Sequence, residues 1–234
     1  NVSDPMTDVY LLTPAGQMEV SSNPMNKYSN IRKDISVQGL GPSYTCALNL
    51  RDHLKKPVGF VVNSQGGSSI TTWYQPGKSN YDATIKRAKE AQRFGRFKAI
   101  IWHQGSSDNS AGIADNFVSY KTNLSKMVQN FRTDLNEPDL FFVLGELSER
   151  SEFDQFNAQV VQSVATYIQN SDYVVTDGTN LLSDGIHFDA ASNILLGERY
   201  AEKILEGVYN TTRSNAAYDE EVLAIIKMDR NQLI

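Results

Sequence analysis

The sequence of 234 residues contains a single cysteine, Cys46, and its apolar runs are all short. One cysteine cannot form an internal disulfide, so the fold does not depend on oxidation. The longest apolar runs, such as VGFVV at 58–62, are far shorter than the roughly 20 residues that a membrane-spanning helix needs. These features are compatible with the cytosol, the periplasm or secretion, and among these we favour a secreted or periplasmic bacterial protein.

The sequence also lacks any excess or block of positive charge. The net charge is −5 and the isoelectric point is near 5.2, which argues against a nucleic acid or an anionic membrane as partner. None of the three histidines belongs to a group with zinc-like spacing. The glycine-rich stretch GGSS at 66–69 lacks the Gly-Lys-Ser/Thr of a phosphate-binding loop. We therefore expect no metal and no cofactor.

Apolar and helical segments alternate along the chain. With 40% hydrophobic and 21% charged residues the composition is globular, and the length suits one domain over residues 1–234. Strand-like runs of Val, Ile, Leu and Phe fall at 58–62, 99–102, 140–144 and 173–176. Helical spacing is found at 81–94, 115–135, 152–169 and 190–208. This order predicts an α/β fold with a three-layer, doubly wound parallel sheet.

Three further elements are expected at the edges of this pattern. A helix should begin at Pro42-Ser43, after the turn GLG at 39–41. The tail at 214–234 carries Val222, Leu223, Ile225 and Ile226 and is expected to be a C-terminal helical extension. Near the N-terminus, two extended runs flank the sequence TPAG, which suits a type I turn closed by a left-handed glycine. We therefore expect an added N-terminal β-hairpin.

Polar loops follow two of the predicted strands, at the sheet edge where parallel α/β proteins bind ligands. These are NSQGGSSI at 63–70 and HQGSSD at 103–108. A third stretch, SDGIHFD at 183–189, places Asp184 three residues before His187, which suits a base and the carboxylate that orients it. Taken singly, each of these stretches is more commonly an ordinary turn. Together, at one rim of one sheet, they indicate a catalytic site.

The motifs NSQGGSSI with Trp73 after it, IIWHQGSSD and DGIHFD resemble the acetylxylan esterase and sialate O-acetylesterase group of SGNH hydrolases. The resemblance extends from about Val9 to Ala201 and includes GLGPSYTCAL. It implies a flavodoxin-like sandwich and a carbohydrate O-acetyl esterase that works through a serine acyl-enzyme.

The resemblance also implies roles for particular residues. His187 would be the general base and Asp184 its orienting partner, while the two polar loops would bind the oxyanion. The donors there would be the backbone N–H of Gly66 or Gly67 and the side-chain amide of Gln104. Trp73 and His103 are expected to contact substrate, although a tryptophan in this position is at least as often a core residue and His103 can equally be structural.

The sequence departs from the family pattern at two positions. The family carries its nucleophilic serine in Gly-Gln-Ser-Asn-Met, whereas this chain has only Gly16-Gln17-Met18-Glu19. The turn at 13–16 suits a hairpin and not a strand-to-helix turn, and a doubly wound sheet would lack its central first strand if nothing preceded Asn1. We therefore expect the serine motif and the first strand upstream of Asn1. Ser21, Ser22, Ser68 and Ser69 are fallback nucleophiles that we disfavour. Ser106 stands where the family usually has Glu, and Asp108 follows two positions later.

Two other functions fit parts of the sequence. The absence of the serine motif and the presence of Ser106 would suit a catalytically inactive, carbohydrate-binding relative. The fold alone would also suit a flavodoxin-like nucleotide or flavin binder.

Overall fold

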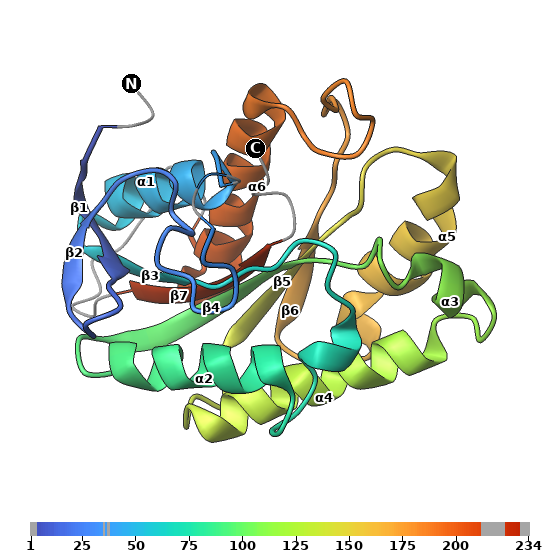
Figure 1. The fold of residues 1–234 in the computed structure, drawn as a ribbon, viewed down its shortest axis with the longest axis horizontal. Helices are drawn as coiled ribbons and strands as arrows, with labels where there is room; N and C mark the ends of the chain where they lie inside the picture. The colour runs from blue at the N-terminus through green and yellow to red at the C-terminus, as the bar shows by residue number, and fades with distance from the viewer. Residues whose placement is uncertain (1–3, 35, 37, 212–222, 230–234) are drawn as a thin grey trace.

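A computed structural model of the chain describes residues 4–34, 36, 38–211 and 223–229, the last of these ranges as backbone only. Its centre is a seven-stranded sheet in the order β2-β1-β3-β7-β4-β5-β6 (Figure 1). Strand β2 runs antiparallel to β1, and every other neighbouring pair is parallel. The strands are β1 (Met6–Leu12), β2 (Met18–Ser21), β3 (Val58–Val62), β4 (Arg96–His103), β5 (Phe141–Gly145), β6 (Ser171–Val174) and β7 (Leu223–Asp229).

Helices cover both faces of this sheet. Helices α1 and α6 lie on one face, and α2 and α4 lie on the other (Figure 1). The α-helices are α1 (Ser43–Leu54), α2 (Ser79–Ala91), α3 (Asn109–Ile113), α4 (Val118–Asp134), α5 (Asp154–Phe156) and α6 (Ala190–Tyr209). Short 3₁₀ turns are η2 (Ile70–Thr72), η3 (Ser151–Phe153) and η5 (Val164–Thr166), and η4 (Asn157–Val161) is a π-helical turn.

The apolar strands explain why two helical layers are needed. Every residue of β3 and of β5 is buried, so side chains on both faces of the sheet require cover. Successive residues enter different cores: Val61 packs with the side chains of α2 and α4, and Phe60 packs with those of α1 and α6. The predicted three-layer, doubly wound α/β fold is confirmed.

The N-terminal hairpin is also confirmed. The Gly16 N–H donates to the Thr13 carbonyl at 3.1 Å, and Gly16 has a φ of +71°, as the predicted turn requires. Strand β1 additionally pairs in parallel with β3, so the hairpin extends the main sheet at its edge.

Two predictions of helix were wrong. Residues 223–229 of the expected C-terminal helix form strand β7; the rest of 214–234 lies outside the described residues. The expected helix at 152–169 is broken into η3, α5, η4 and η5. The Asn157 side chain causes part of this irregularity, because it bonds both the N–H and the carbonyl of Leu147, at 2.8 and 3.0 Å, at the start of the π-helical turn.

Strand β7 lies at the centre of the sheet, parallel to both β3 and β4. The sheet formed by the described residues therefore has a parallel strand at its centre, supplied by β7. Among the residues described, no helix is long and apolar enough to cross a membrane.

Candidate active site

The loop that carries Asp184 and His187 is held at both ends before α6 begins. Leu181 and Phe188 form an antiparallel bridge, and Phe188 is buried. Asp189 then caps α6 by accepting a hydrogen bond from the N–H of Ser192 at 2.7 Å. The imidazole is therefore carried on a short loop that is anchored in the core on its C-terminal side.

Asp184 and His187 form the hydrogen-bonded pair that the sequence predicted. Oδ2 of Asp184 lies 2.6 Å from Nδ1 of His187, and Oδ1 accepts the backbone N–H groups of Ile186 and His187 at 2.8 and 3.0 Å. The bond to the imidazole, followed by the two backbone bonds, lowers the pKa of Asp184 to about 2. An ionised carboxylate at Nδ1 keeps a hydrogen on that nitrogen and leaves Nε2 as the basic atom.

A small cavity of about 20 Å³ lies beside this loop. Ile186 and Phe188, the neighbours of His187, line it together with residues that follow β4 and β5. The other lining residues are His103, Gln104, Ser106, Leu147, Ser148, Arg150 and Phe153. The Asp184–His187 loop and the loop at 103–108 (the HQG loop) therefore contribute residues to the lining of one cavity.

Arg150 holds the Asp184–His187 loop from the β5 side. Its guanidinium donates to the Gly185 carbonyl at 2.9 Å and to the Glu152 carboxylate at 3.0 Å. Sequence reasoning missed Arg150, because a basic residue in the loop after a strand carries no signal of such a contact.

Asp108 joins the two polar loops, at 63–70 and 103–108, that the family resemblance predicts to bind the oxyanion. One carboxylate oxygen accepts the Ser69 hydroxyl at 2.6 Å, and the other accepts the N–H of Ile70 at 3.0 Å and the amide of Gln104 at 2.6 Å. The same amide nitrogen donates to the Ser68 carbonyl at 2.9 Å. Both hydrogens of the Gln104 amide are thus bonded to protein oxygens, and an oxyanion would have to replace one of these acceptors.

Gly66 and Gly67 lie on the adjacent turn, which leads from β3 to η2. Gly67 is exposed and has a φ of +71°. Within the described part of the chain, neither the Gly66 nor the Gly67 N–H forms a hydrogen bond. These donors are available to a ligand, but neither glycine lines the cavity beside His187.

His103 is a buried wall of the cavity. Its Nδ1 lies 2.8 Å from the Tyr200 hydroxyl, and its ring meets Phe188 edge-on. Gly145, at the end of β5, makes room for this contact: a Cβ there would lie 1.9 Å from the Tyr200 hydroxyl and 2.3 Å from Nδ1 of His103. The environment favours the structural alternative for His103, although the residue does face the cavity.

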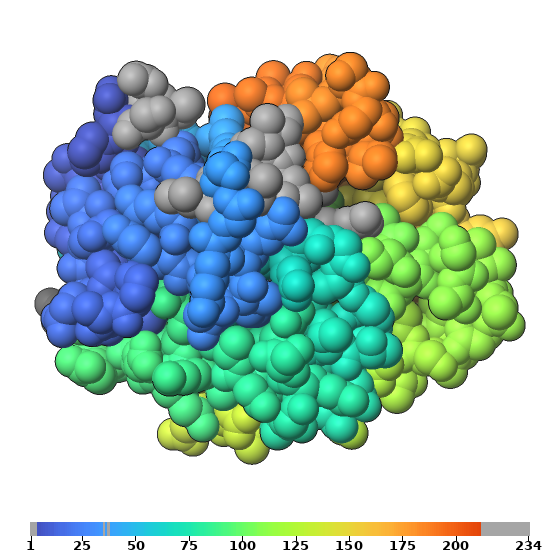
Figure 2. Space-filling model, in the orientation of Figure 1, coloured from blue at the N-terminus to red at the C-terminus, as the bar shows by residue number. Residues whose placement is uncertain are grey.

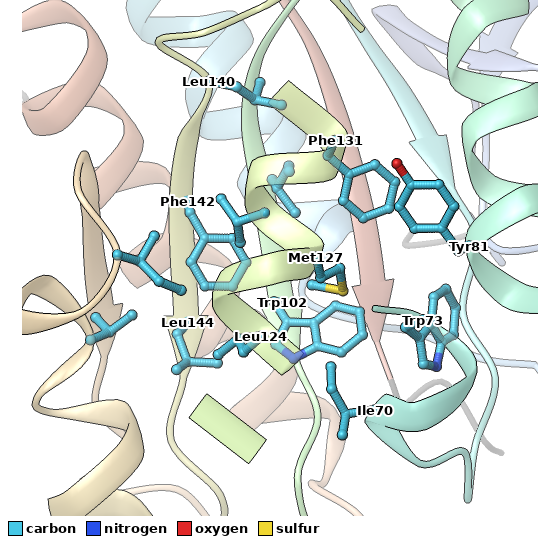
Figure 3. Packing of buried hydrophobic residues seen from close by; sticks show 14 of the residues in the cluster. Ile70, Trp73, Tyr81, Trp102, Leu124, Met127, Phe131, Leu140, Phe142 and Leu144 are labelled. Carbon is cyan, nitrogen blue, oxygen red and sulfur yellow. The ribbon is translucent and has the colours of Figure 1, made fainter. Parts of the chain in front are cut away.

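Trp73 lies in the core. It is 1% exposed and packs edge-on against Trp102, with ring centroids 5.4 Å apart (Figure 3). Its Nε1 donates to the Ser68 hydroxyl at 3.0 Å. This placement favours a packing role over the predicted contact with substrate.

None of the four fallback nucleophiles forms a hydrogen bond with His187 in the described structure. Ser21 is fully buried, and the Ser22 hydroxyl accepts Nζ of Lys27 at 2.8 Å. The Ser68 hydroxyl donates to the Gln65 carbonyl, and that of Ser69 donates to Asp108. No hydroxyl of the described residues forms a hydrogen bond with Nε2 of His187. Over the same residues, no group of three or more His, Cys, Asp or Glu side chains could hold a metal ion.

The structure thus combines a three-layer α/β sandwich with an Asp–His pair and two polar loops at the carboxyl edge of its sheet, where α/β proteins bind their ligands. Residues 1–206 match the family described as carbohydrate esterase, sialic acid-specific acetylesterase (SASA), and the chain belongs to this family.

Two known proteins are similar to this chain, one in sequence and structure and the other in fold. A probable carbohydrate esterase of Arabidopsis thaliana is 29% identical over 175 residues, which is 72% of this chain and 65% of the relative. The X-ray structure of the Arabidopsis protein superposes with a TM-score of 0.76 at 25% identity, covering 88% of this chain and 84% of that one. The structure of a carbohydrate acetylesterase from Xanthomonas citri superposes with a TM-score of 0.59 at 19% identity. The superposition covers 90% of this chain and 52% of the Xanthomonas chain, and it shows a likeness of fold alone.

Proposed function

We propose that this protein is an O-acetyl esterase of acetylated carbohydrate that works through a serine acyl-enzyme. The observation that carries the proposal is the Asp184–His187 pair, with 2.6 Å between Oδ2 and Nδ1, in a chain that belongs to a carbohydrate esterase family. Membership of the family supports ester hydrolysis, and the pair supplies the base that such a reaction needs.

In this mechanism Nε2 of His187 takes the proton of a serine hydroxyl as its oxygen attacks the acetyl carbonyl. Asp184 stays ionised, holds the ring by Nδ1 and stabilises the imidazolium that forms. As the tetrahedral intermediate collapses, the bond between the acetyl carbon and the sugar oxygen breaks, and the imidazolium gives its proton to that oxygen, which leaves as a hydroxyl. Water, activated by the same nitrogen, hydrolyses the acetyl-enzyme to acetate and regenerates the serine.

The oxyanion would accept a hydrogen bond from the free N–H of Gly66 or Gly67. It would accept a second one from the side-chain amide of Gln104, once that amide has given up one of its two present acceptors. Of the two acceptors, the neutral Ser68 carbonyl holds the amide at 2.9 Å, while the charged Asp108 holds it at 2.6 Å. We propose that the oxyanion replaces the Ser68 carbonyl, because the bond to the charged group is the stronger one. One donor to an oxyanion lowers the barrier by about 3 kcal/mol.

The size of the cavity supports acetyl as the acyl group. A volume of about 20 Å³ accommodates about one water-sized group, which suits the methyl of an acetyl group. The serine hydroxyl of this mechanism is not identified among the described residues, because none of their hydroxyls forms a hydrogen bond with His187.

A catalytically inactive, carbohydrate-binding relative is the second candidate. Two observations favour it: the Gln104 amide is fully bonded, and no described hydroxyl bonds Nε2 of His187. Incubation of the full-length protein with an acetylated xylo-oligosaccharide distinguishes the two candidates. The esterase releases acetate catalytically, with many turnovers per protein molecule. Binding of the oligosaccharide without release of acetate would establish the inactive relative.

A further inference from the structure

A second, basic cavity lies away from the Asp184–His187 loop. It measures about 400 Å³ and lies between the β1–β2 turn, the segment 27–33 and the C-terminal half of α2. Figure 2 shows these three segments meeting on one face of the molecule. None of its lining residues lines the cavity beside His187.

Cations dominate the lining of this cavity. Lys27, Lys33, Lys86 and Arg87 contribute four positive charges, and Glu90 is the only acidic residue of the lining. Lys27 is already engaged, because its Nζ lies 3.4 Å from the Glu19 carboxylate. Lys33 and Lys86 are exposed, and neither forms an ion pair with another described residue. The cavity therefore presents uncompensated positive charge to solvent.

Arg87 is the most unusual of these cations, because it is only 5% exposed. Its Nη2 donates to the Leu12 carbonyl at 2.6 Å, and its Nε, buried as well, has no acceptor within the described structure. Burial lowers the pKa of this guanidinium, and Glu90 opposes that shift. A buried guanidinium with one neutral acceptor is costly unless an anion accompanies it.

The size of the cavity points to an organic ligand. A volume of about 400 Å³ falls in the range of cavities that hold small organic molecules, and it exceeds what a single inorganic oxyanion occupies. Arginine pairs with carboxylates through two parallel hydrogen bonds, and lysines on the rim add charge. We propose that this cavity binds a carboxylate-bearing sugar unit, as a non-catalytic subsite for acidic carbohydrate. The inference rests on the proposed function for the carbohydrate part of the ligand.

Calorimetric titration tests this subsite directly. The probes are trigalacturonate and sialyllactose, with neutral xylotriose and inorganic phosphate for comparison. The test variant is Lys33→Gln/Lys86→Gln, and the matched control is Lys89→Gln, an exposed lysine of α2 outside the cavity lining. We expect one or both acidic probes to bind. The double variant should weaken that binding at least tenfold, the control less than twofold, and xylotriose should not bind at this site.

Three outcomes overturn the proposal: neither acidic probe binds, the double variant binds as tightly as the wild type, or phosphate at equal concentration displaces the sugar. The last result would define a site for simple anions. Turnover of 4-nitrophenyl acetate is measured on the same preparations and should be the same in all three proteins. Binding without turnover in the wild type would remove the esterase proposal and leave the subsite intact.

Discussion

The Asp108 carboxylate lies 2.6 Å from the Ser69 hydroxyl and 2.6 Å from the Gln104 amide, and so joins two loops that are distant in sequence. The family resemblance places a glutamate at position 106, where this chain has serine. In this structure the negative charge of the HQG loop comes instead from Asp108, two residues further on. In the proposed mechanism Asp108 would position Gln104, whose amide it accepts.

Asp108→Asn should reduce kcat about 10- to 100-fold and change KM less than threefold. An asparagine presents one acceptor atom where the carboxylate presents two, and a hydrogen bond to a charged group contributes about 1.5–3 kcal/mol. Steady-state kinetics on an acetyl ester measure both constants. Asp154→Asn, at an exposed residue, is the control. A rise in KM with kcat unchanged would show that Asp108 does not position Gln104 for the oxyanion.

Asp184→Asn should lower kcat about 10³- to 10⁴-fold with little change in KM. The amide cannot stabilise an imidazolium, and it favours the wrong tautomer of His187. The substitution keeps the shape of the side chain, so circular dichroism should report an unchanged fold. Unaltered turnover would remove Asp184 from the mechanism.

The pH dependence follows from the lowered pKa of Asp184, about 2. A lowered carboxyl pKa stabilises the native state above the unfolded value of 3.8, and this contribution is lost as the pH falls toward 2. The carboxylate thus stays ionised at neutral pH. Protonation of Asp184 should therefore cause no loss of kcat/KM above its unfolded pKa of 3.8, and pH–rate profiles of the wild type and Asp184→Asn check this. A loss above pH 3.8 that is present in the wild type and absent from Asp184→Asn would contradict this assignment.

The small cavity should limit the acyl group. Phe153→Ala and Leu147→Ala remove buried side chains from its lining and should raise the butyrate-to-acetate ratio of kcat/KM about tenfold. Leu135→Ala, at a buried residue outside the cavity lining, should lower stability by about 2–5 kcal/mol, as much as Leu147→Ala does. It should leave the butyrate-to-acetate ratio of kcat/KM unchanged. A butyrate-to-acetate ratio equal to that of the wild type in all three variants would show that the acyl group binds outside this cavity.

Trp73→Phe should lower stability by about 1–3 kcal/mol and leave KM for carbohydrate within twofold. The substitution removes the Nε1 bond to Ser68 and part of the packing against Trp102. Urea denaturation and KM for an acetylated oligosaccharide measure the two effects. A tenfold rise in KM at unchanged stability would restore Trp73 to the substrate site.

The layers of the fold were predictable because their signals are local. The run VGFVV predicted β3 to the residue, and helical spacing predicted α6 within one residue of its C-terminal end. The tail was misread because a short run such as LAII suits a strand paired on both sides as well as a helix. The break at η4 depends on the bonds between Asn157 and Leu147, which the spacing of apolar residues does not reveal.

The site was predictable only where its parts are close in sequence. Asp184 and His187 are three residues apart, so one loop suffices to join them. The contacts of Asp108 with Ser69, and of Arg150 with Gly185, span 39 and 35 residues. The first depends on β3 and β4 lying on either side of β7, and the second on β5 pairing with β6. Burial of Trp73 is likewise a property of the whole core.

The central claim is that His187, oriented by Asp184, is the base of an acyl-transfer reaction. The most direct test is the turnover of 4-nitrophenyl acetate by the full-length protein and by His187→Ala, with His53→Ala as the histidine control. We predict that kcat falls at least 10³-fold in His187→Ala and less than twofold in His53→Ala. Equal turnover by wild type and His187→Ala, or no turnover by the wild type, would contradict the claim.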